Sequence, residues 1–182
     1  MTETMRAVVL DAPGPPDALT IREIPIPAPV AGDVLIAVKA FGLNRSELHT
    51  RLGLAVGVTF PRVLGIEATG LVAACPGGEF AVGQQVVAMM GGMGRVLDGG
   101  YAEYTSVPAS QVIAFTSTLD WAILGAVPEM LQTSYGSLTV ERLPPVAPAW
   151  LHKRSIRAAP IPDGKVHSGA VLLRGFEPEP SL

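Results

Sequence analysis

The side chains best suited to chemistry gather in one stretch of the chain, FGLNRSELHTR, with one more in FPRVLGIEATG shortly after it. Asn44, Arg45, Ser46 and His49 supply an amide, a guanidinium, a hydroxyl and an imidazole in close succession. Glu67 adds a carboxylate inside an apolar and small-residue run, where burial is costly unless the carboxylate is paired or hydrogen-bonded. We therefore expect polar groups from a helix start and from a strand interior to converge on one cleft.

The elements that position these residues follow from the flanking patterns. Asp33–Gly42 is predicted to be a strand that runs into Asn44, whose short polar side chain suits a helix N-cap. The helix itself should cover about Arg45–Leu52. After a glycine-broken connector, Val63–Ala74 is predicted to be one continuous strand that carries Glu67.

Short strands separated by Pro and Gly turns recur through the first two thirds of the chain. Further strands are predicted at Met5–Leu10, Leu19–Ile26, Val82–Met90 and Tyr101–Val107. This rhythm predicts a mostly antiparallel β fold rather than a helical bundle. The glycine-rich run at Met89–Gly94 lacks the strand–glycine–helix order of a dinucleotide fingerprint, so a mobile loop beside the cleft and a plain hairpin connection both stay open.

Two helices should follow the β region. Asp120 is suited to cap a short helix that ends near Leu124. Pro128, a favoured first-turn residue, is predicted to open a second helix that runs to about Val140.

The composition changes abruptly after this second helix. The last 42 residues contain six of the 13 Lys and Arg and seven of the 17 Pro. We therefore divide the chain into 1–119, 120–140 and a tail, 141–182, that should be mostly disordered. A truncated or frame-shifted reading of a longer gene would explain such an ending, as would a natural short form with a new tail.

The bulk composition excludes several classes of protein. With 182 residues, 48% hydrophobic and 16% charged, the chain is long enough for one domain with a real core. A net charge of −3 without a Lys/Arg cluster argues against nucleic-acid binding. No run reaches the apolar length of a membrane helix and no signal pattern opens the chain, so we expect no membrane contact and a cytoplasmic location. Cys75 is the single cysteine and is interpreted as a structural side chain.

Four ordered segments together resemble one family. They are GLNRSELHTRLG, FPRVLGIEATGLV, GGYAEYTSVPA (Gly99–Ala109) and MLQTSYGSL (Met130–Leu138), preceded by MRAVVLDAPGPP. Over about Met5–Val140 the chain is similar to the medium-chain dehydrogenase/reductase superfamily, in its zinc-independent, quinone-oxidoreductase-like branch. The resemblance implies a GroES-like, partly open β-barrel with short helices for residues 1–119. It implies that 120–140 begins a nucleotide-binding domain that does not follow.

The resemblance also implies a chemistry. Family members transfer a hydride from NADPH to a quinone, an enone or another carbonyl compound. Zinc-dependent members have cysteine at the position of Asn44 and histidine at that of Ile66, so we expect no catalytic zinc here.

The same resemblance assigns roles to individual residues, each beside a simpler structural one. Asn44 and Thr133 match positions beside the nicotinamide, although Asn44 also suits a plain N-cap. Arg45 matches a position that contacts cofactor phosphate, and a solvated helix arginine is the alternative. Ser46 and His49 match a proton relay of the zinc alcohol dehydrogenases, which makes them candidate catalytic residues together with Asn44.

Two functions are therefore carried forward. One is an NADPH-dependent, zinc-independent oxidoreductase domain. The other is a non-catalytic fragment or interaction module that associates, also with a second copy of itself, through the apolar face around Trp121–Tyr135.

Overall fold

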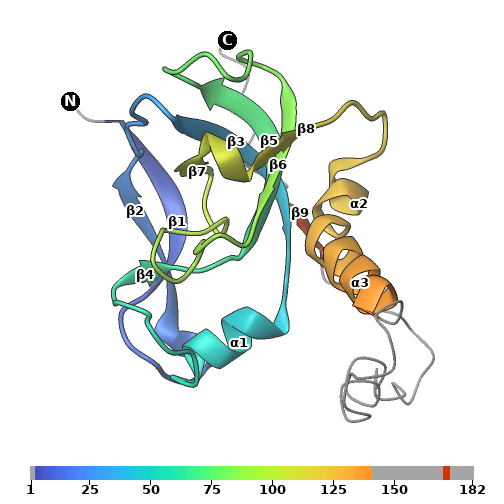
Figure 1. The fold of residues 1–182 in the computed structure, drawn as a ribbon. Coiled ribbons are helices and arrows are strands. Elements are labelled where there is room, and N and C mark those ends of the chain that lie inside the picture. Colours follow the sequence, from blue (N-terminus) through green and yellow to red (C-terminus); the bar gives the residue numbers. More distant parts are fainter. Residues whose placement is uncertain (1–2, 141–169, 173–182) are drawn as a thin grey trace.

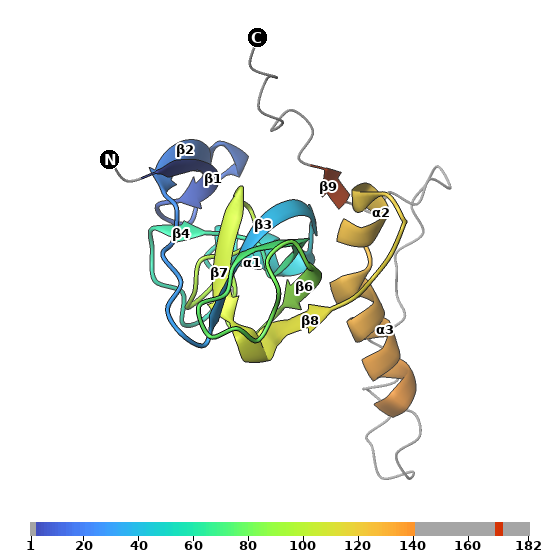
Figure 2. The ribbon, with the colours of Figure 1, turned by 90° about the horizontal axis from the view of Figure 1, so that it is seen from above.

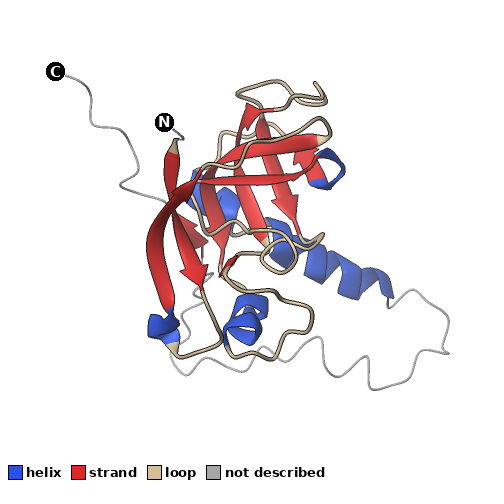
Figure 3. Ribbon diagram, turned by 90° about the vertical axis from the view of Figure 1, so that its left-hand side faces the viewer, coloured by secondary structure: helices blue, strands red, loops and turns tan. Residues whose placement is uncertain are grey.

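The computed structural model describes residues 3–140 and 170–172, and they form a mainly β domain with three short α-helices (Figures 1 and 3). A small antiparallel sheet has the strand order β2-β1-β4. Its strands are β1 (Thr4–Leu10), β2 (Leu19–Pro25) and β4 (Arg62–Val63), and the 3₁₀ turn η1 (Pro16–Ala18) connects the first two.

A larger sheet curls into a half-barrel with the strand order β7-β3-β5-β6-β8, and all of its pairs are antiparallel. Its strands are β3 (Asp33–Gly42), β5 (Glu67–Ala74), β6 (Gln85–Met89), β7 (Tyr104–Pro108) and β8 (Val112–Ala114); the 3₁₀ turn η2 (Ala109–Gln111) precedes β8. The predicted fold class, a partly open β-barrel with short helices, is confirmed.

The core lies between the two sheets and follows the two-residue period of the strands. Met5, Ala7 and Val9 of β1 are buried on one face, and Val34, Ile36 and Val38 of β3 meet them from the larger sheet. Burying each such side chain stabilises the fold by about 1.5–3 kcal/mol, so the alternating pattern determines which face of each strand turns inward.

The three helices lie outside the barrel. Helix α1 (Arg45–Arg51) follows β3. Helix α2 (Trp121–Gly125) packs against β3 and β5, and α3 (Pro128–Val140) lies beside β6 (Figure 2). The Asp120 carboxylate caps α2 by accepting a hydrogen bond from the Ala122 N–H at 2.8 Å. The predicted helix positions and the Asp120 cap are confirmed. None of the helices in the described part of the chain has the length and apolarity that crossing a membrane requires.

The single strand predicted at Val63–Ala74 is wrong, because the chain breaks there into β4 and β5, which belong to different sheets. The break falls at Gly65, whose φ of +104° is rarely open to a residue with a side chain. An added Cβ would lie 2.7 Å from the Gly100 N and 2.8 Å from the Tyr101 N. Backbone packing from a distant segment therefore splits an apolar run that looks continuous in the sequence.

Most of the tail for which we predicted disorder, residues 141–169 and 173–182, lies outside the described residues. Within it, Ala170–Leu172 forms strand β9, which pairs with Ala40–Gly42 of β3. The sequence analysis had not included this strand.

The break at Gly65 predicts a strong, position-specific stability effect. Gly65→Ala should lower the free energy of unfolding by about 2–5 kcal/mol, since left-handed strain costs about 1–2 kcal/mol and overpacking about 1–3 kcal/mol. Gly78→Ala is the matched control, because Gly78 also has positive φ (+79°) but nothing within 4 Å of an added Cβ. In urea unfolding, Gly78→Ala should lower the free energy of unfolding only by the strain of about 1–2 kcal/mol. Equal losses in the two variants would show that the Gly65 contacts are not tight.

Candidate functional site

The Glu67 carboxylate joins three elements at one point. Oε1 accepts a hydrogen bond from Asn44 Nδ2 at 2.7 Å, and Oε2 accepts one from the Glu129 backbone N–H at 3.0 Å. Glu67 begins β5, Asn44 precedes α1, and Glu129 lies in the first turn of α3. The residue is 2% exposed, and these two bonds partly offset the cost of desolvating its carboxylate. The expected convergence of a helix start and a strand residue is therefore present, and Glu67 forms its centre.

A second buried carboxylate, Glu47, holds the other side of the same junction. Its Oε2 accepts from the Asn44 backbone N–H at 3.0 Å, and its Oε1 accepts from the Ile66 backbone N–H at 2.9 Å. The sequence analysis missed Glu47, although its signal was present. It stands three residues after the N-cap, where a glutamate reaches back to the cap N–H in a capping box.

Burial dominates the ionisation of both carboxylates. Desolvation raises the pKa of Glu67, and the hydrogen bonds from Asn44 and Glu129 only partly oppose it. Desolvation likewise raises the pKa of Glu47 against its bonds to Ile66 and Asn44, and the charge of Glu67 adds to the rise. Burial also raises the pKa of Tyr101, and the negative charges of Glu47 and Glu67 raise it further. The Tyr101 ring packs against that of Phe41, with 4.5 Å between the ring centroids.

Ser46 lines a cavity of about 360 Å³ next to this junction. Ile66 lines the same cavity, together with Met90 and Met93 of the glycine-rich loop and with Arg95, which follows that loop. The glycine-rich loop therefore lies beside a cavity, which is one of the two alternatives left open for it. Of the predicted catalytic residues Asn44, Ser46 and His49, Ser46 lines this cavity.

Arg45 and His49 are placed differently. Arg45 is exposed at the start of α1, and His49 is half-buried in its last turn. Neither lines the cavity that contains Ser46, so the structure does not join Ser46 and His49 in one cavity wall. Their roles in phosphate contact and proton relay stay predictions.

Thr133 is linked to Asn44 through the two glutamates. Its Oγ1 donates to Glu129 Oε1 at 2.8 Å, and the Glu129 backbone N–H donates to Glu67, which holds Asn44. The two residues predicted to flank a nicotinamide therefore belong to one hydrogen-bonded chain, although they stand on different helices.

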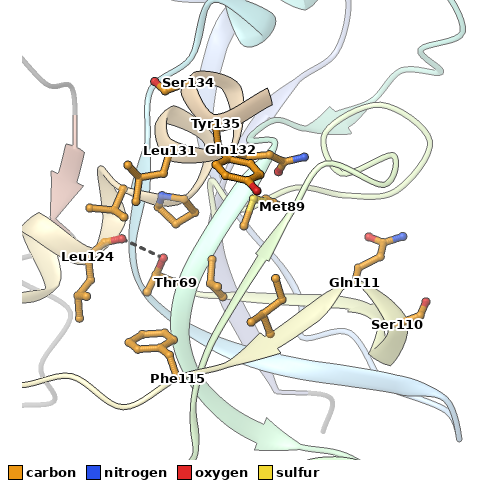
Figure 4. Close-up of a pocket in the computed structure, with 14 residues that line it drawn as sticks. Thr69, Met89, Ser110, Gln111, Phe115, Leu124, Leu131, Gln132, Ser134 and Tyr135 are labelled. Carbon is orange, nitrogen blue, oxygen red and sulfur yellow. Dashed lines mark hydrogen bonds between the residues drawn. The ribbon is translucent and has the colours of Figure 1, made fainter. Parts of the chain in front are cut away.

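A second, larger cavity of about 900 Å³ lies between the half-barrel and α3 (Figure 4). Apolar side chains dominate its wall, including Met89, Phe115, Leu124 and Leu131. Thr69 Oγ1 donates to the Leu124 carbonyl at 3.3 Å, which ties β5 to α2 beside the cavity.

The donor atoms at the junction do not fit a zinc ion. Ile66 has a hydrocarbon side chain, and the Asn44 Nδ2 is already a hydrogen-bond donor to Glu67. The Cys75 thiol lies in the turn after β5, where it donates to Glu79 Oε2 at 3.2 Å. In residues 3–140 and 170–172 no three His, Cys, Asp or Glu side chains are grouped to hold a metal.

A curled half-barrel followed by two helices, with a helix start and a buried glutamate meeting at a cavity, defines a GroES-like β domain. Residues 30–117 match the family described as the alcohol dehydrogenase GroES-like domain. A zinc-type alcohol dehydrogenase-like protein of Schizosaccharomyces pombe is 28% identical over 122 residues, 66% of this chain and 37% of the relative. The putative quinone oxidoreductase YhfP of Bacillus subtilis is 34% identical over 87 residues, 47% of this chain and 26% of the relative.

Solved structures give the same result. A mycobacterial protein in complex with NADPH superposes with a TM-score of 0.64 at 27% identity, covering 78% of this chain and 41% of the other. Residues 30–117 therefore carry an alcohol dehydrogenase GroES-like domain, and the chain is similar to the N-terminal part of medium-chain dehydrogenases/reductases. It spans less than half the length of each of these three relatives.

The raised pKa of Glu67 predicts a direction for the pH dependence of stability. Between the unfolded pKa near 4.5 and the raised folded pKa, the native state holds more protons than the unfolded state. Stability contributed by Glu67 is therefore present at low pH and lost as the pH rises through the folded pKa. In Glu67→Gln this loss should disappear, so the stability of the wild type relative to the variant should fall with rising pH.

Urea unfolding of both proteins from pH 4.5 to pH 8 measures this difference. Glu103→Gln, a change at a partly exposed carboxylate that pairs with Arg6, is the control for the loss of any one carboxylate. A wild-type advantage over Glu67→Gln that grows with pH would mean that the hydrogen bonds outweigh desolvation.

The donor set also predicts the metal content. Elemental analysis of purified, tag-free protein should find zinc well below one equivalent, because positions 44 and 66 offer neither thiolate nor imidazole. Zinc at one equivalent that survives dialysis would contradict this assignment.

Proposed function

We propose that this chain is the substrate-side domain of a zinc-independent, NADPH-dependent reductase of quinones, enones or other carbonyl compounds in the cytoplasm. The supporting observation is the fixed position of Asn44 next to a cavity that Ser46 lines: Glu67 accepts from its side-chain amide, and Glu47 accepts from its backbone N–H. The alcohol dehydrogenase GroES-like domain supports the same chemistry, as do relatives described as a quinone oxidoreductase and as an NADPH complex.

The roles of the residues follow from their positions. Reduced nicotinamide, when bound, would supply a hydride to an electrophilic carbon of the acceptor, and a proton from water would complete the reduction. The Ser46 hydroxyl would donate a hydrogen bond to the acceptor oxygen, where negative charge develops. Glu67 would keep the Asn44 amide in one orientation, since its Oε1 accepts a hydrogen bond from Asn44 Nδ2.

The described residues offer groups for the nicotinamide end of the cofactor and for one phosphate. Asn44 and Thr133 would contact the nicotinamide, and the exposed Arg45 guanidinium would reach a phosphate. The glycine turn and helix N-terminus that hold a pyrophosphate in dinucleotide-binding folds have no counterpart among the described residues. Each missing charge-assisted phosphate contact would weaken binding by about 1.5–3 kcal/mol.

A second candidate function rests on the apolar face next to α3. Ile123, Met130, Leu131 and Tyr135 are each more than half exposed, and contiguous exposed apolar surface favours association. In this alternative the chain is a non-catalytic interaction module, and a second copy of itself is one candidate partner.

The chain alone should therefore bind NADPH no more tightly than millimolar and should not oxidise it with a quinone. Reduced nicotinamide mononucleotide at millimolar concentration should still shift the NMR signals of the Asn44 side-chain amide and the Thr133 methyl group. Asn44→Ala should abolish the Thr133 shift, whereas Arg22→Gln, on the far sheet, should leave it unchanged.

Two results would contradict the proposal. Absence of any nicotinamide-induced shift would favour the interaction module, and light scattering on the same sample would then report self-association. Saturable quinone-dependent turnover that is lost in Asn44→Ala and Thr133→Ala would show that the chain, or two copies of it, completes the cofactor site after all.

A further inference from the structure

The cavity beside Ser46 contains a charge that the proposed function does not use. Its wall is apolar at Ile66, Met90, Met93 and Val96, while Ser46 and Arg95 supply its polar side-chain groups. A volume of about 360 Å³ suits a small organic molecule rather than a cofactor or a peptide.

Arg95 differs from the paired arginines of the domain. Arg6, Arg22 and Arg62 form ion pairs with acidic side chains, and Arg51 donates to a backbone carbonyl. Among the side chains of residues 3–136, none gives the half-buried Arg95 guanidinium a hydrogen bond or an ion pair. Arg45 is also without an ion pair, but it is exposed and does not line this cavity. A guanidinium has five donors, and partial burial without a partner is costly.

The loop that carries Arg95 is held in place by backbone contacts. The N–H groups of Val96 and Leu97 both donate to the Gly92 carbonyl at 3.0 Å, and the Arg95 N–H donates to it at 3.1 Å. At Gly94 the loop packs against Gly65, where an added Cβ would lie 3.0 Å from the Gly65 N. Arg95 is thus presented to the cavity by a hydrogen-bonded turn that packs on the β4–β5 link.

We propose that this cavity selects a small, mostly apolar carbonyl compound that carries a carboxylate, with Arg95 binding the carboxylate. The inference rests on the proposed function and narrows its substrate class. The Glu47 carboxylate accepts a hydrogen bond from the Ile66 N–H at 2.9 Å, so a negative charge on a ligand is disfavoured at the part of the wall that Ile66 forms. The carboxylate would therefore bind at Arg95 and the carbonyl group would lie towards Ser46, whose hydroxyl would donate to the carbonyl oxygen while the carbonyl carbon takes the hydride.

Two probes of matched shape test the inference by binding alone. 4-Acetylbenzoate and 4-acetylbenzamide share the ring and the ketone, and they differ in the charge of one substituent. Calorimetric titration of the full chain should show the benzoate binding about 10–100-fold more tightly, which corresponds to one charge-assisted contact of about 1.5–3 kcal/mol.

Variants assign that preference to Arg95. Arg95→Gln should lose it while binding the benzamide as before, and Arg95→Glu should favour the benzamide. Arg22→Gln is the matched control, because Arg22 pairs with Asp11 on the exposed strand β2 and such surface pairs contribute little. Circular dichroism of all four proteins should be the same.

Equal binding of both probes to the wild type, binding of neither, or an unchanged preference in Arg95→Gln would overturn the inference. The outcome is separable from that of the proposed function, because no nicotinamide is present. A charge preference that depends on Arg95, found in a chain that shows no nicotinamide response, would sustain the anion site and refute the reductase.

Discussion

The buried Glu67 carboxylate is the interaction on which the arrangement of this domain depends. It is the point where β5, the start of α1 and the first turn of α3 meet, through bonds of 2.7 and 3.0 Å to groups 23 and 62 residues away in sequence. Removing it would leave two donors without partners at a buried junction, which costs about 1–3 kcal/mol for each. Burying the Glu67 carboxylate costs stability because the carboxylate is desolvated, but its hydrogen bond holds Asn44 in one position. Buried polar groups of this kind are common where a site must hold one geometry.

Close packing around the junction limits which residues the chain can carry there. A Cβ at Gly42 would meet Glu67 Oε1, and one at Gly125 would lie 2.5 Å from the Ala40 Cβ. Strand β3 and helix α2 can approach each other only because these two positions lack side chains. Gly65 does the same for the loop at Gly99–Tyr101, where a continuous strand would have pushed the two sheets apart. The glycines of this domain therefore serve as contact points between segments as well as turns.

The domain also has two cavities of different character. The smaller one, beside Ser46, has a hydroxyl and the Arg95 guanidinium, which has no side-chain partner among residues 3–136, in an apolar wall. The larger one, beside α3, is mostly apolar, with a hydrogen bond between Thr69 and Leu124 at its edge. Specific polar groups in the first make it the better place for chemistry and discrimination. The larger cavity offers apolar surface with few polar groups to orient a ligand, which suits association with another protein surface. One domain thus has features for both functions considered for it, on different faces.

Local pattern was enough to predict much of this protein. Strand β3, the Asn44 and Asp120 caps and the start of α3 at Pro128 depend on neighbours within a few residues, and the absence of thiolate and imidazole at positions 44 and 66 is visible without any structure. Only the tertiary structure decided the break at Gly65 and the hydrogen bond from the Ile66 N–H to Glu47, 19 residues away. The same holds for the link from Thr133 through Glu129 to Glu67 and for the place of Arg95 in the cavity wall. These features depend on which distant segments come into contact, and that contact is determined by burial of the whole core rather than by the residues on either side.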